Sequence, residues 1–496
     1  MEWTPDARAE LRALLGEDGV LDSEAARFAY EADALTLERG LPDVVVLPRS
    51  TDEVAALVRW AHANGLPVTA RGAGTGLAGG ATPHRGGMLL VTSRMDQVLA
   101  LDPERRFAWV QPGLVNARLS ELTAPHGLHF APDPSSQPVS TIGGNVAANA
   151  GGPHCLKHGV TANHLLGLVV ALYDGGVVTL GGEAPDSPEA DLASVVAGSE
   201  GTLGVLCEIC VRLVPRPEAV HTMSLDFAVV EDACRAVSAV IAAGIVPAAM
   251  ELMDRRTMEV VEAWLHLGLP LDAAAVLLIE VDGPAVSLPA QVGRITAITR
   301  EHGARGVRVA SDAAERAALW RGRKSSFGAY GRTGRAFYLM DGTVPRSRLA
   351  EAVASVYALA EARGLSAGTL IHAGDGNLHP HILFDADDEA QRQVALEVSQ
   401  EILRACIRLG GTISGEHGIG LEKIPMMSEV YAPADLETMG RLRRAFDPGG
   451  LMNPGKVWPG EAGAGAPPAH TRPPARPGGA EARHDQEGPW NRGSRT

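Results

Sequence analysis

Two histidines flank a tight-turn signal in the segment LIHAGDGNLHPHILF, residues 370 to 384. Asp375 and Gly376 form an Asp-Gly pair between two apolar stretches, which predicts a β-hairpin with these two residues at its tip. In that register His372 faces His379 directly, and directly opposed Cβ atoms lie about 4.5 to 5.5 Å apart. Two imidazoles at this separation can share one divalent metal ion.

A third ligand for such an ion is available in the segment SGEHGIG, residues 414 to 420. Glu416 and His417 are neighbours there, and neighbouring side chains in extended backbone point in different directions. One of them can therefore bind metal while the other faces a substrate. His381, two residues beyond His379, is a rival ligand. We expect it to support the ligands or merely to pack, since Glu416 also neutralises the charge of the ion.

Three segments rich in small residues lie in the first half of the chain. The first, RGAGTGLAGG at 71–80, contains a G-x-G-x-x-G, but the strand MLLVT follows it where a Rossmann loop would open a helix. Its glycines can instead turn successive amides into a concavity suited to a diphosphate. PDPSSQPVSTIGGNVAANAGG at 132–152 adds hydroxyl donors and a short helix, and AGSEGTLGV at 197–205 precedes a strand. Three such loops predict the site of a long, extended cofactor.

The elements that carry these loops alternate along the chain. A strand at 44–48, a capped helix ending at Gly65 and a strand at 67–70 lead into the first loop. The Pro-rich VPRPEAV at 214–220 marks a domain boundary. Beyond it, helices and strands alternate again, with helices at 231–243 and 349–363 and strands at 275–281 and 369–373. We therefore expect an α+β protein.

Length, charge and the composition of the two ends indicate which class of protein this chain belongs to. With 496 residues it exceeds the size at which one hydrophobic core usually stops growing, so we expect two domains. A formal net charge of −15 disfavours binding to nucleic acid. The first residues lack an export signal and no window is long enough to span a membrane, which predicts a cytoplasmic protein. Residues 460–496 have few apolar anchors and are expected to be disordered.

The five cysteines are scattered and odd in number, unlike a disulfide framework. Cys207 and Cys210 form a C-x-x-C within GVLCEICVRLVP, a β-branched run that predicts a strand. Because no second Cys pair or nearby His completes a metal site, we expect two packed thiols.

At these motifs the sequence resembles the FAD-linked oxidase branch of the vanillyl-alcohol oxidase family, which includes D-lactate dehydrogenase, D-2-hydroxyglutarate dehydrogenase and the D subunit of glycolate oxidase. TIGGN, GSEGTLG, HAGDGNLHP, GEHGIG and NPGK carry the resemblance, which extends from about Pro42 to Lys456. It implies a two-part PCMH-type FAD-binding domain at 1–217 and a substrate or cap domain with an antiparallel sheet at 218–458. The expected tail is then 459–496.

The resemblance also implies which residues hold FAD. Binding is expected to be non-covalent, because the first loop has neither the His nor the Cys that some relatives use for attachment. The implied cofactor-binding residues are Arg71, Gly72, Ala73, Gly74, Thr75, Gly76, Leu77, Ser136, Thr141, Gly143, Gly144, Asn145, Ser199, Glu200, Gly201, Gly204, Val205 and Asn453.

For the histidine segments, the resemblance implies specific roles. His372, His379 and Glu416 are the implied ligands of a divalent metal ion, zinc or manganese, and His417 is the implied general base. In the proposed reaction the metal lowers the pKa of a substrate hydroxyl, His417 accepts its proton, and hydride passes to the flavin.

The segment LWRGRKSSFGA supplies Arg323 and Lys324 as a substrate-carboxylate clamp, a role that an Arg fork suits and that the resemblance favours. Leu339 stands where the 2-hydroxyglutarate branch carries a lysine. A second substrate carboxylate is therefore not expected to be recognised.

The resemblance thus predicts FAD-dependent oxidation of a small D-2-hydroxy acid, glycolate or D-lactate. Two alternatives are a redox-neutral FAD transferase of the alkyl-glycerone-phosphate synthase type and a non-catalytic flavin subunit. The expected partners are a second flavin-domain subunit and an iron–sulfur subunit, through which the protein would be peripheral to a membrane.

Overall fold

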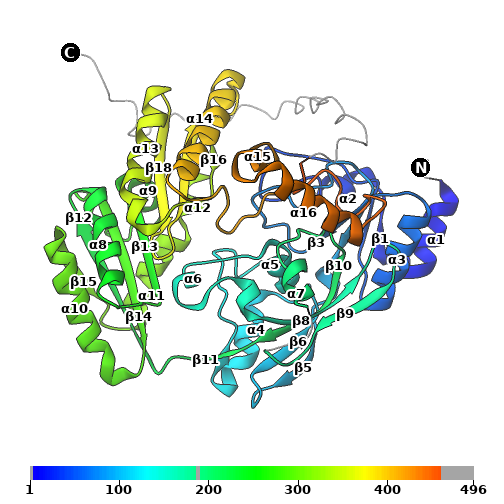
Figure 1. Ribbon diagram of the computed structural model, residues 1–496, viewed down its shortest axis with the longest axis horizontal. Helices are drawn as coiled ribbons and strands as arrows, with labels where there is room; N and C mark the ends of the chain where they lie inside the picture. The colour runs from blue at the N-terminus through cyan, green and yellow to red at the C-terminus, as the bar shows by residue number, and fades with distance from the viewer. Residues whose placement is uncertain (1–3, 186–189, 460–496) are drawn as a thin grey trace. The chain divides into compact units, whose positions relative to one another are not determined.

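The first part of the chain builds two main sheets that carry the glycine-rich loops (Figure 1). The computed structural model describes residues 4–185 and 190–459, so the tail predicted for 459–496 lies almost wholly outside the described residues. One sheet has four strands in the order β1 (Val20–Leu21), β2 (Val44–Val46), β4 (Met88–Val91) and β3 (Val68–Arg71). The other has five antiparallel strands in the order β5 (Val98–Asp102), β6 (Phe107–Val110), β10 (Val205–Arg212), β8 (Leu165–Ala171) and β9 (Val177–Gly181).

The strand and helix predicted before the first loop are confirmed. Strands β2 and β3 both pair with β4 in parallel, and residues 44–46 are buried because the sheet is covered. Helix α3 (Thr51–Ala63) begins at Ser50, whose Oγ accepts a hydrogen bond from the Glu53 N–H at 3.2 Å. Strand β3 then delivers the chain directly into the first loop.

The remaining elements of this part surround the second and third loops. They are α1 (Pro5–Leu15), α2 (Glu24–Phe28), α4 (Asn116–Thr123), α5 (Ile142–Ala148), α6 (Cys155–His158), α7 (Leu192–Val196) and the short pair β7 (Leu128–His129) with β11 (Val214–Pro215). Cys207 and Cys210 lie in β10 and are buried free thiols, as predicted.

The second part is built on one large antiparallel sheet. Its order is β15 (Ala304–Val309), β12 (Ala219–Phe227), β14 (Ala275–Gly283), β13 (Ala249–Asp254), β18 (Ser366–His372), β19 (Asn377–Phe384) and β16 (Ala336–Leu339), with β17 (Gly342–Thr343) also paired to β19. Its helices are α8 (Val230–Ala242), α9 (Arg255–Leu265), α10 (Leu288–Glu301), α11 (Ala313–Lys324), α12 (Ser326–Tyr330), α13 (Leu349–Ala362) and α14 (Glu389–Arg408). The last helices, α15 (Met427–Val430) and α16 (Pro433–Phe446), follow, and α16 contacts the first part through Arg443 and Phe446.

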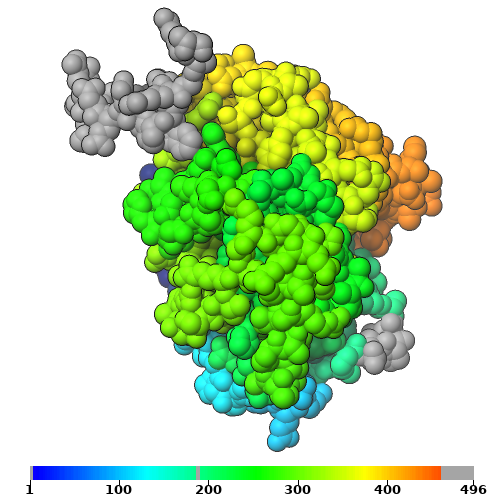
Figure 2. All heavy atoms as spheres, turned by 90° about the vertical axis from the view of Figure 1, so that its left-hand side faces the viewer, coloured from blue at the N-terminus to red at the C-terminus, as the bar shows by residue number. Residues whose placement is uncertain are grey.

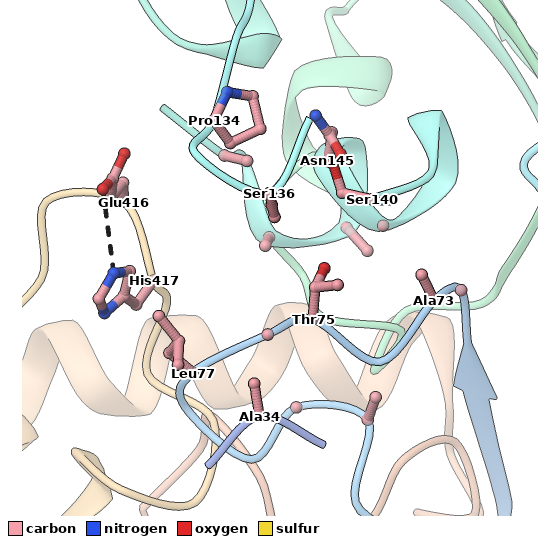
Figure 3. A pocket seen from close by; sticks show the side chains of 18 of the residues that line it. Ala34, Ala73, Thr75, Leu77, Pro134, Ser136, Ser140, Asn145, Glu416 and His417 are labelled. Carbon is pink, nitrogen blue, oxygen red and sulfur yellow. Dashed lines mark ion pairs between the residues drawn. The ribbon is translucent and has the colours of Figure 1, made fainter. Parts of the chain in front are cut away.

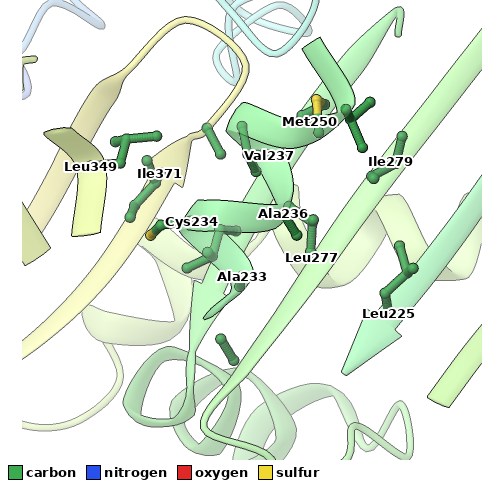
Figure 4. Packing of buried hydrophobic residues seen from close by; sticks show 14 of the residues in the cluster. Leu225, Ala233, Cys234, Ala236, Val237, Met250, Leu277, Ile279, Leu349 and Ile371 are labelled. Carbon is green, nitrogen blue, oxygen red and sulfur yellow. The ribbon is translucent and has the colours of Figure 1, made fainter. Parts of the chain in front are cut away.

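The two faces of this sheet have different roles. On one face, α8 packs Ala233 and Val237 against Leu277 and Ile371, and α10 and α13 complete the core (Figure 4). Figure 2 views this part from the left-hand side of Figure 1, where green to yellow residues form most of the visible face. Because side chains alternate along a strand, the polar residues next to these core positions all point to the other face. That face carries the candidate site.

None of the helices in the described parts of the chain is both long and apolar enough to cross a membrane.

A buried ionic contact joins the two parts. His154, just before α6, has Nδ1 2.8 Å from Asp133 Oδ2 and Nε2 3.2 Å from Glu280 Oε1 of β14. The same ring stacks on Trp320 of α11. The loop that leads out of the second glycine segment is therefore fixed to the large sheet.

We expect His154 to make the protein less stable as the pH rises from about 7 to about 10. Burial alone lowers the pKa of this imidazole, but Asp133 and Glu280 raise it to about 10. The resulting stabilisation is fully present below the unfolded pKa, about 6.5, and is lost as the pH rises through the folded pKa. Denaturant unfolding at both pH values should show a larger loss for the wild-type chain than for His154→Gln. Equal losses in the two proteins would contradict this assignment.

Candidate functional site

One cavity of about 510 Å³ brings the three glycine-rich loops and the histidine segments together (Figure 3). Figure 3 shows Ala73, Thr75 and Leu77 of the first loop across from Ser136 and Asn145 of the second. Glu416 and His417 stand on a separate loop at one end of the same space (Figure 3). Its volume is in the usual range for cofactor and ligand pockets, about 300 to 1,000 Å³.

The loops approach one another so closely that side chains are excluded. Thr141 Oγ1 accepts the Gly144 N–H at 3.2 Å, and a Cβ added to Gly72 would lie 2.3 Å from that same oxygen. Gly74 has a φ of 71°, a conformation that side chains disfavour. The glycines therefore leave a backbone-lined cradle that fits an extended dinucleotide.

Most residues predicted to bind the cofactor line this cavity, and two do not. The fully buried Asn453 lies behind the loops, where its Nδ2 donates to Gly80 O at 2.8 Å and Glu200 O at 2.6 Å. Ser199 also lies outside the lining, and its carbonyl accepts the Thr202 hydroxyl at 2.7 Å. Asn453 and Ser199 thus hold the loops in place, and direct contact with the cofactor stays a prediction for the others.

We expect Gly143→Ala to weaken cofactor binding. The added Cβ would lie 2.5 Å from Pro112 Cβ and 2.8 Å from Pro112 O, and a backbone carbonyl cannot move aside as a flexible side chain can. Overpacking of this kind costs about 1 to 3 kcal/mol. Gly182→Ala, where nothing lies within 4 Å of the added atom, is the matched control. Cofactor retained per chain after gel filtration measures the effect, and equal retention in both variants would contradict it.

The hairpin register predicted from the Asp-Gly pair is wrong. β18 ends at His372 and β19 begins at Asn377, so these two residues face each other and His379 faces Leu370. The turn closes with the Gly376 N–H donating to His372 O at 3.0 Å, and Gly376 has a φ of 91°. The shift by two residues keeps His372 and His379 on one face, with ring centroids 5.0 Å apart.

The geometry around these two histidines suits a metal ion. His372 Nε2 lies 3.2 Å and His379 Nε2 lies 3.0 Å from Glu416 Oε1. His379 Nδ1 donates its proton to Met340 O at 3.1 Å, so Nε2 is the nitrogen whose lone pair can bind a metal ion. The three ligand atoms lie within 4.8 Å of one another, so His372, His379 and Glu416 fit one divalent cation.

Glu251, which the sequence analysis did not single out, holds two of the predicted site residues. Its Oε1 lies 2.8 Å from His372 Nδ1, and its Oε2 accepts from Arg323 Nε at 2.5 Å. Although burial opposes it, the carboxylates of Glu251 and Glu416 raise the pKa of His372 well above its usual value. A carboxylate in the middle of the fully buried strand AMELMD was the signal that could have revealed this residue.

We expect Glu251→Gln to weaken metal binding by about 10- to 100-fold without removing a ligand. A carboxylate that accepts the Nδ1 proton of a metal-bound histidine orients the ring and makes Nε2 more basic. Gln keeps the size and one acceptor but loses the charge. Equilibrium titration of the apoprotein with Zn²⁺ against a chelating indicator measures the affinity. An affinity equal to that of the wild type would contradict the role.

Asp341 fixes the loop that carries Glu416 and His417. Its carboxylate accepts the His417 N–H at 2.8 Å, the Ser414 hydroxyl at 2.7 Å and the buried Lys423 ammonium at 3.0 Å. Asp341, His379 and His417 form a second cluster with metal-ligand spacing. Because Asp341 is already satisfied by these donors, the His372, His379 and Glu416 group fits a cation better.

His417 is placed to act beside that group. Its ring stacks on His379 with centroids 5.0 Å apart, and its Nε2 lies 3.9 Å from Glu416 Oε1. Burial lowers the pKa of His417 to about 4, so the imidazole is neutral near pH 7. A neutral imidazole is the form that can accept a proton.

His381 lines the same cavity but lies outside both clusters of potential ligands. Its ring stacks on Tyr330 with centroids 4.1 Å apart, and its Nδ1 lies 3.0 Å from His379 O. Burial lowers the pKa of His381 to about 3. His381 therefore packs outside the ligand set, and whether it also supports the ligands stays a prediction.

The two predicted clamp residues occupy different environments. Arg323 is buried and lines the cavity, with Nε and Nη2 directed to Glu251 and His372. Lys324 also lines the cavity, is partly exposed, and has Nζ 3.8 Å from Asp133 Oδ2.

Comparison with known proteins identifies the family. An FAD binding domain matches residues 42–181, and the C-terminal domain of FAD linked oxidases matches residues 216–457. The glycolate oxidase subunit GlcD of Escherichia coli (strain K12) is 44% identical over 440 residues, which cover 89% of this chain and 88% of that protein. The chain belongs to the FAD-linked oxidase family. The FAD binding domain match contains the first two glycine loops that line the cavity.

Two further relatives are similar over nearly the whole chain. GlcD of Bacillus subtilis (strain 168) is 38% identical over 92% of this chain and 98% of that protein. A D-lactate dehydrogenase of Archaeoglobus fulgidus is 33% identical over 88% and 96%.

Solved structures confirm the expected α+β fold with its PCMH-type domain. p-Cresol methylhydroxylase with substrate bound has a TM-score of 0.76 at 17% identity, covering 91% of this chain and 96% of that chain. An alkyldihydroxyacetonephosphate synthase has a TM-score of 0.73 at 20% identity, covering 91% and 86%. At these identities the likeness shows the fold alone, so it gives the transferase alternative no support.

Proposed function

We propose that this protein is an FAD-dependent dehydrogenase that oxidises a small 2-hydroxy acid, glycolate or D-lactate, to the 2-oxo acid. One observation carries the proposal: a single cavity joins the three glycine loops to the metal-ligand group (His372, His379 and Glu416), to His417 and to Arg323. The relatives named glycolate oxidase subunit and D-lactate dehydrogenase support the same reaction class. The D configuration rests on these relatives.

Two bound groups complete this site in the proposal. The three loops would hold FAD, which would supply the hydride acceptor. His372, His379 and Glu416 would hold a divalent cation, zinc or manganese, whose positive charge would lower the pKa of the substrate hydroxyl.

His417 is the proposed general base. Its Nδ1 lies 4.0 Å from the Asp341 carboxylate, whose negative charge favours a protonated ring. Its Nε2 faces the Glu416 side, where the hydroxyl would lie, and takes up the hydroxyl proton there. Asp341 and Lys423 keep the loop fixed during this transfer.

Arg323 is the proposed partner of the substrate carboxylate. Its contacts with Glu251 and His372 use Nε and Nη2, so Nη1 stays available for the acid. Phe327 and Leu339 line the same cavity and offer no charge for a second carboxylate, and the Lys324 ammonium there lies 3.8 Å from Asp133 Oδ2. This lining favours a small monocarboxylate over a dicarboxylate.

Electron transfer beyond the flavin is proposed to need partner subunits. The relatives from Escherichia coli and Bacillus subtilis are named subunits, and the five cysteines of this chain are scattered. We propose a second flavin-domain subunit and an iron–sulfur subunit as partners, with any membrane association made through them.

Anaerobic reduction of the flavin tests the proposed function. The absorbance of oxidised flavin near ~450 nm is followed while glycolate, D-lactate, L-lactate and D-2-hydroxyglutarate are added separately to the purified holoprotein. We expect rapid bleaching by glycolate or D-lactate. A flavin that no 2-hydroxy acid bleaches, even with added Zn²⁺ or Mn²⁺, would overturn the proposal in favour of a transferase or a non-catalytic subunit.

A further inference from the structure

The loop that carries His417 is held from both parts of the chain. From the second part, the Asp341 carboxylate accepts the His417 N–H at 2.8 Å. From the first part, one oxygen of Glu200, Oε1, accepts the Ile419 N–H at 2.8 Å and the Gly420 N–H at 3.0 Å. Glu200 belongs to the third glycine-rich segment and lines the same cavity as His417. Its side chain therefore connects the glycine-rich loops to the loop of the proposed base.

The backbone of Glu200 is fixed in an unusual conformation. Its N–H donates to Ala147 O of α5 at 2.8 Å, and its carbonyl accepts a hydrogen bond from Asn453 Nδ2 at 2.6 Å. Its φ of 53° lies in the left-handed region, which residues other than glycine rarely adopt. Such residues persist in this region where the surrounding structure or the function requires them. A glutamate at this position thus indicates that its side chain has a task that glycine could not perform.

Glycines in the loop let it approach Glu200 and the first glycine-rich segment. A Cβ added to Gly418 would lie 2.5 Å from Glu200 Oε1, and one added to Gly420 would lie 1.9 Å from Ala78 O. The same Ala78 carbonyl accepts the Leu421 N–H at 2.8 Å. The C-terminal end of the loop is therefore packed closely against two of the three glycine-rich segments.

We infer that Glu200 is a positioning residue for the proposed reaction: its Oε1 holds residues 418–420, so that His417 keeps its place relative to the glycine-rich loops. This inference rests on the proposed function, in which His417 takes up the hydroxyl proton while hydride passes to the flavin. Misplacement of a reacting group by about 1 Å can slow a reaction by about 10²-fold. Binding of the acid by Arg323 should depend less on Glu200, because Glu251 holds that side chain.

Two substitutions separate the reach of the Glu200 side chain from its charge. Glu200→Gln keeps an oxygen at the same distance from the backbone and loses the charge, whereas Glu200→Asp keeps the charge and withdraws the oxygen by one methylene. Neither removes the polar side chain, so both variants are expected to fold. A positioning role predicts that Glu200→Gln resembles the wild type and that Glu200→Asp does not. A role of the charge predicts the reverse.

Amide hydrogen exchange of the FAD-loaded protein measures the contact without substrate. Mass spectrometry of overlapping peptides follows the amides of Ile419 and Gly420, which donate to Glu200. We expect these amides to exchange roughly ten-fold faster in Glu200→Asp than in the wild type or in Glu200→Gln, because an amide exchanges only when its hydrogen bond opens. Residues 377–384 of β19 are the internal control and should exchange equally in all three proteins.

Anaerobic stopped-flow reduction of the flavin measures the consequence. At saturating hydroxy acid, we expect Glu200→Asp to reduce its flavin about 10²-fold more slowly than the wild type, with an unchanged acid concentration for the half-maximal rate. Glu200→Gln should stay within about three-fold of the wild-type rate. FAD and metal content per chain are determined for each variant, so that the rates compare fully loaded proteins.

The outcomes distinguish the inference from the proposed function. Equal exchange of the two amides in all three proteins, or a loss of rate in Glu200→Gln that matches the loss in Glu200→Asp, overturns the positioning role while the proposed function stands. A change confined to the half-saturating acid concentration also overturns it, because that change reports substrate binding. A wild-type flavin that no 2-hydroxy acid reduces overturns the proposed function and, with it, the role inferred for Glu200.

Discussion

Replacing His417 with Ala is expected to leave FAD bound and to slow flavin reduction by the hydroxy acid by about 10²- to 10⁴-fold, the usual contribution of a general base. His417 lies on the loop at one end of the cavity (Figure 3). Its ring packs on His379, and its backbone N–H, which donates to Asp341, is unchanged by the substitution. The loop should therefore keep its position while the proton acceptor is lost.

The measurement is anaerobic stopped-flow reduction of the flavin by the acid that bleaches the wild type. His126→Ala, at an exposed histidine outside the cavity, is the control and should reduce at the wild-type rate. FAD and metal content per chain are determined for both variants, so that a lost cofactor is not mistaken for a lost base. Flavin reduction in His417→Ala at the wild-type rate would contradict the assignment of His417 as the general base.

His379→Ala is expected to lose the metal ion and, with it, most of the activity. The substitution removes one of three ligands, and the remaining His372 and Glu416 cannot complete the coordination of a zinc-type ion. It also removes one of the two imidazoles that contact the Glu416 carboxylate. Burial raises the pKa of Glu416, but His372 and His379 together hold it well below its usual range.

His381→Gln is the matched control for that prediction. His381 lies two residues along the same strand and lines the same cavity, but its ring nitrogens are outside the ligand cluster. We expect this variant to keep the wild-type metal content, measured by elemental analysis after dialysis against metal-free buffer. Loss of metal in His381→Gln together with retention in His379→Ala would show that His381, and not His379, is the metal ligand.

The hairpin illustrates how far local sequence signals reach. The Asp-Gly pair predicted a turn of two residues, whereas the chain needs the four residues 373–376 between β18 and β19. A distant segment decides this length, because the Val344 N–H donates to Gly376 O at 3.0 Å and a Cβ at Gly376 would meet the Val344 carbonyl at 2.1 Å. His372 and His379 still lie on the same face of the hairpin, as predicted, because a shift by two residues preserves the alternation of side chains.

The sequence alone predicted the glycine loops, the strands and helices that lead into them, and three candidate metal ligands that the structure brings together. These depend on short-range spacing, on turn chemistry and on the motifs of a family. Tertiary structure decided the partners: Glu251 lies 121 residues before His372, and Asp341 lies 82 residues before Lys423. The residues near an acidic side chain in a strand do not indicate its partner. The contact forms only when the sheet register and the alternation of side chains place residues of distant strands on the same face.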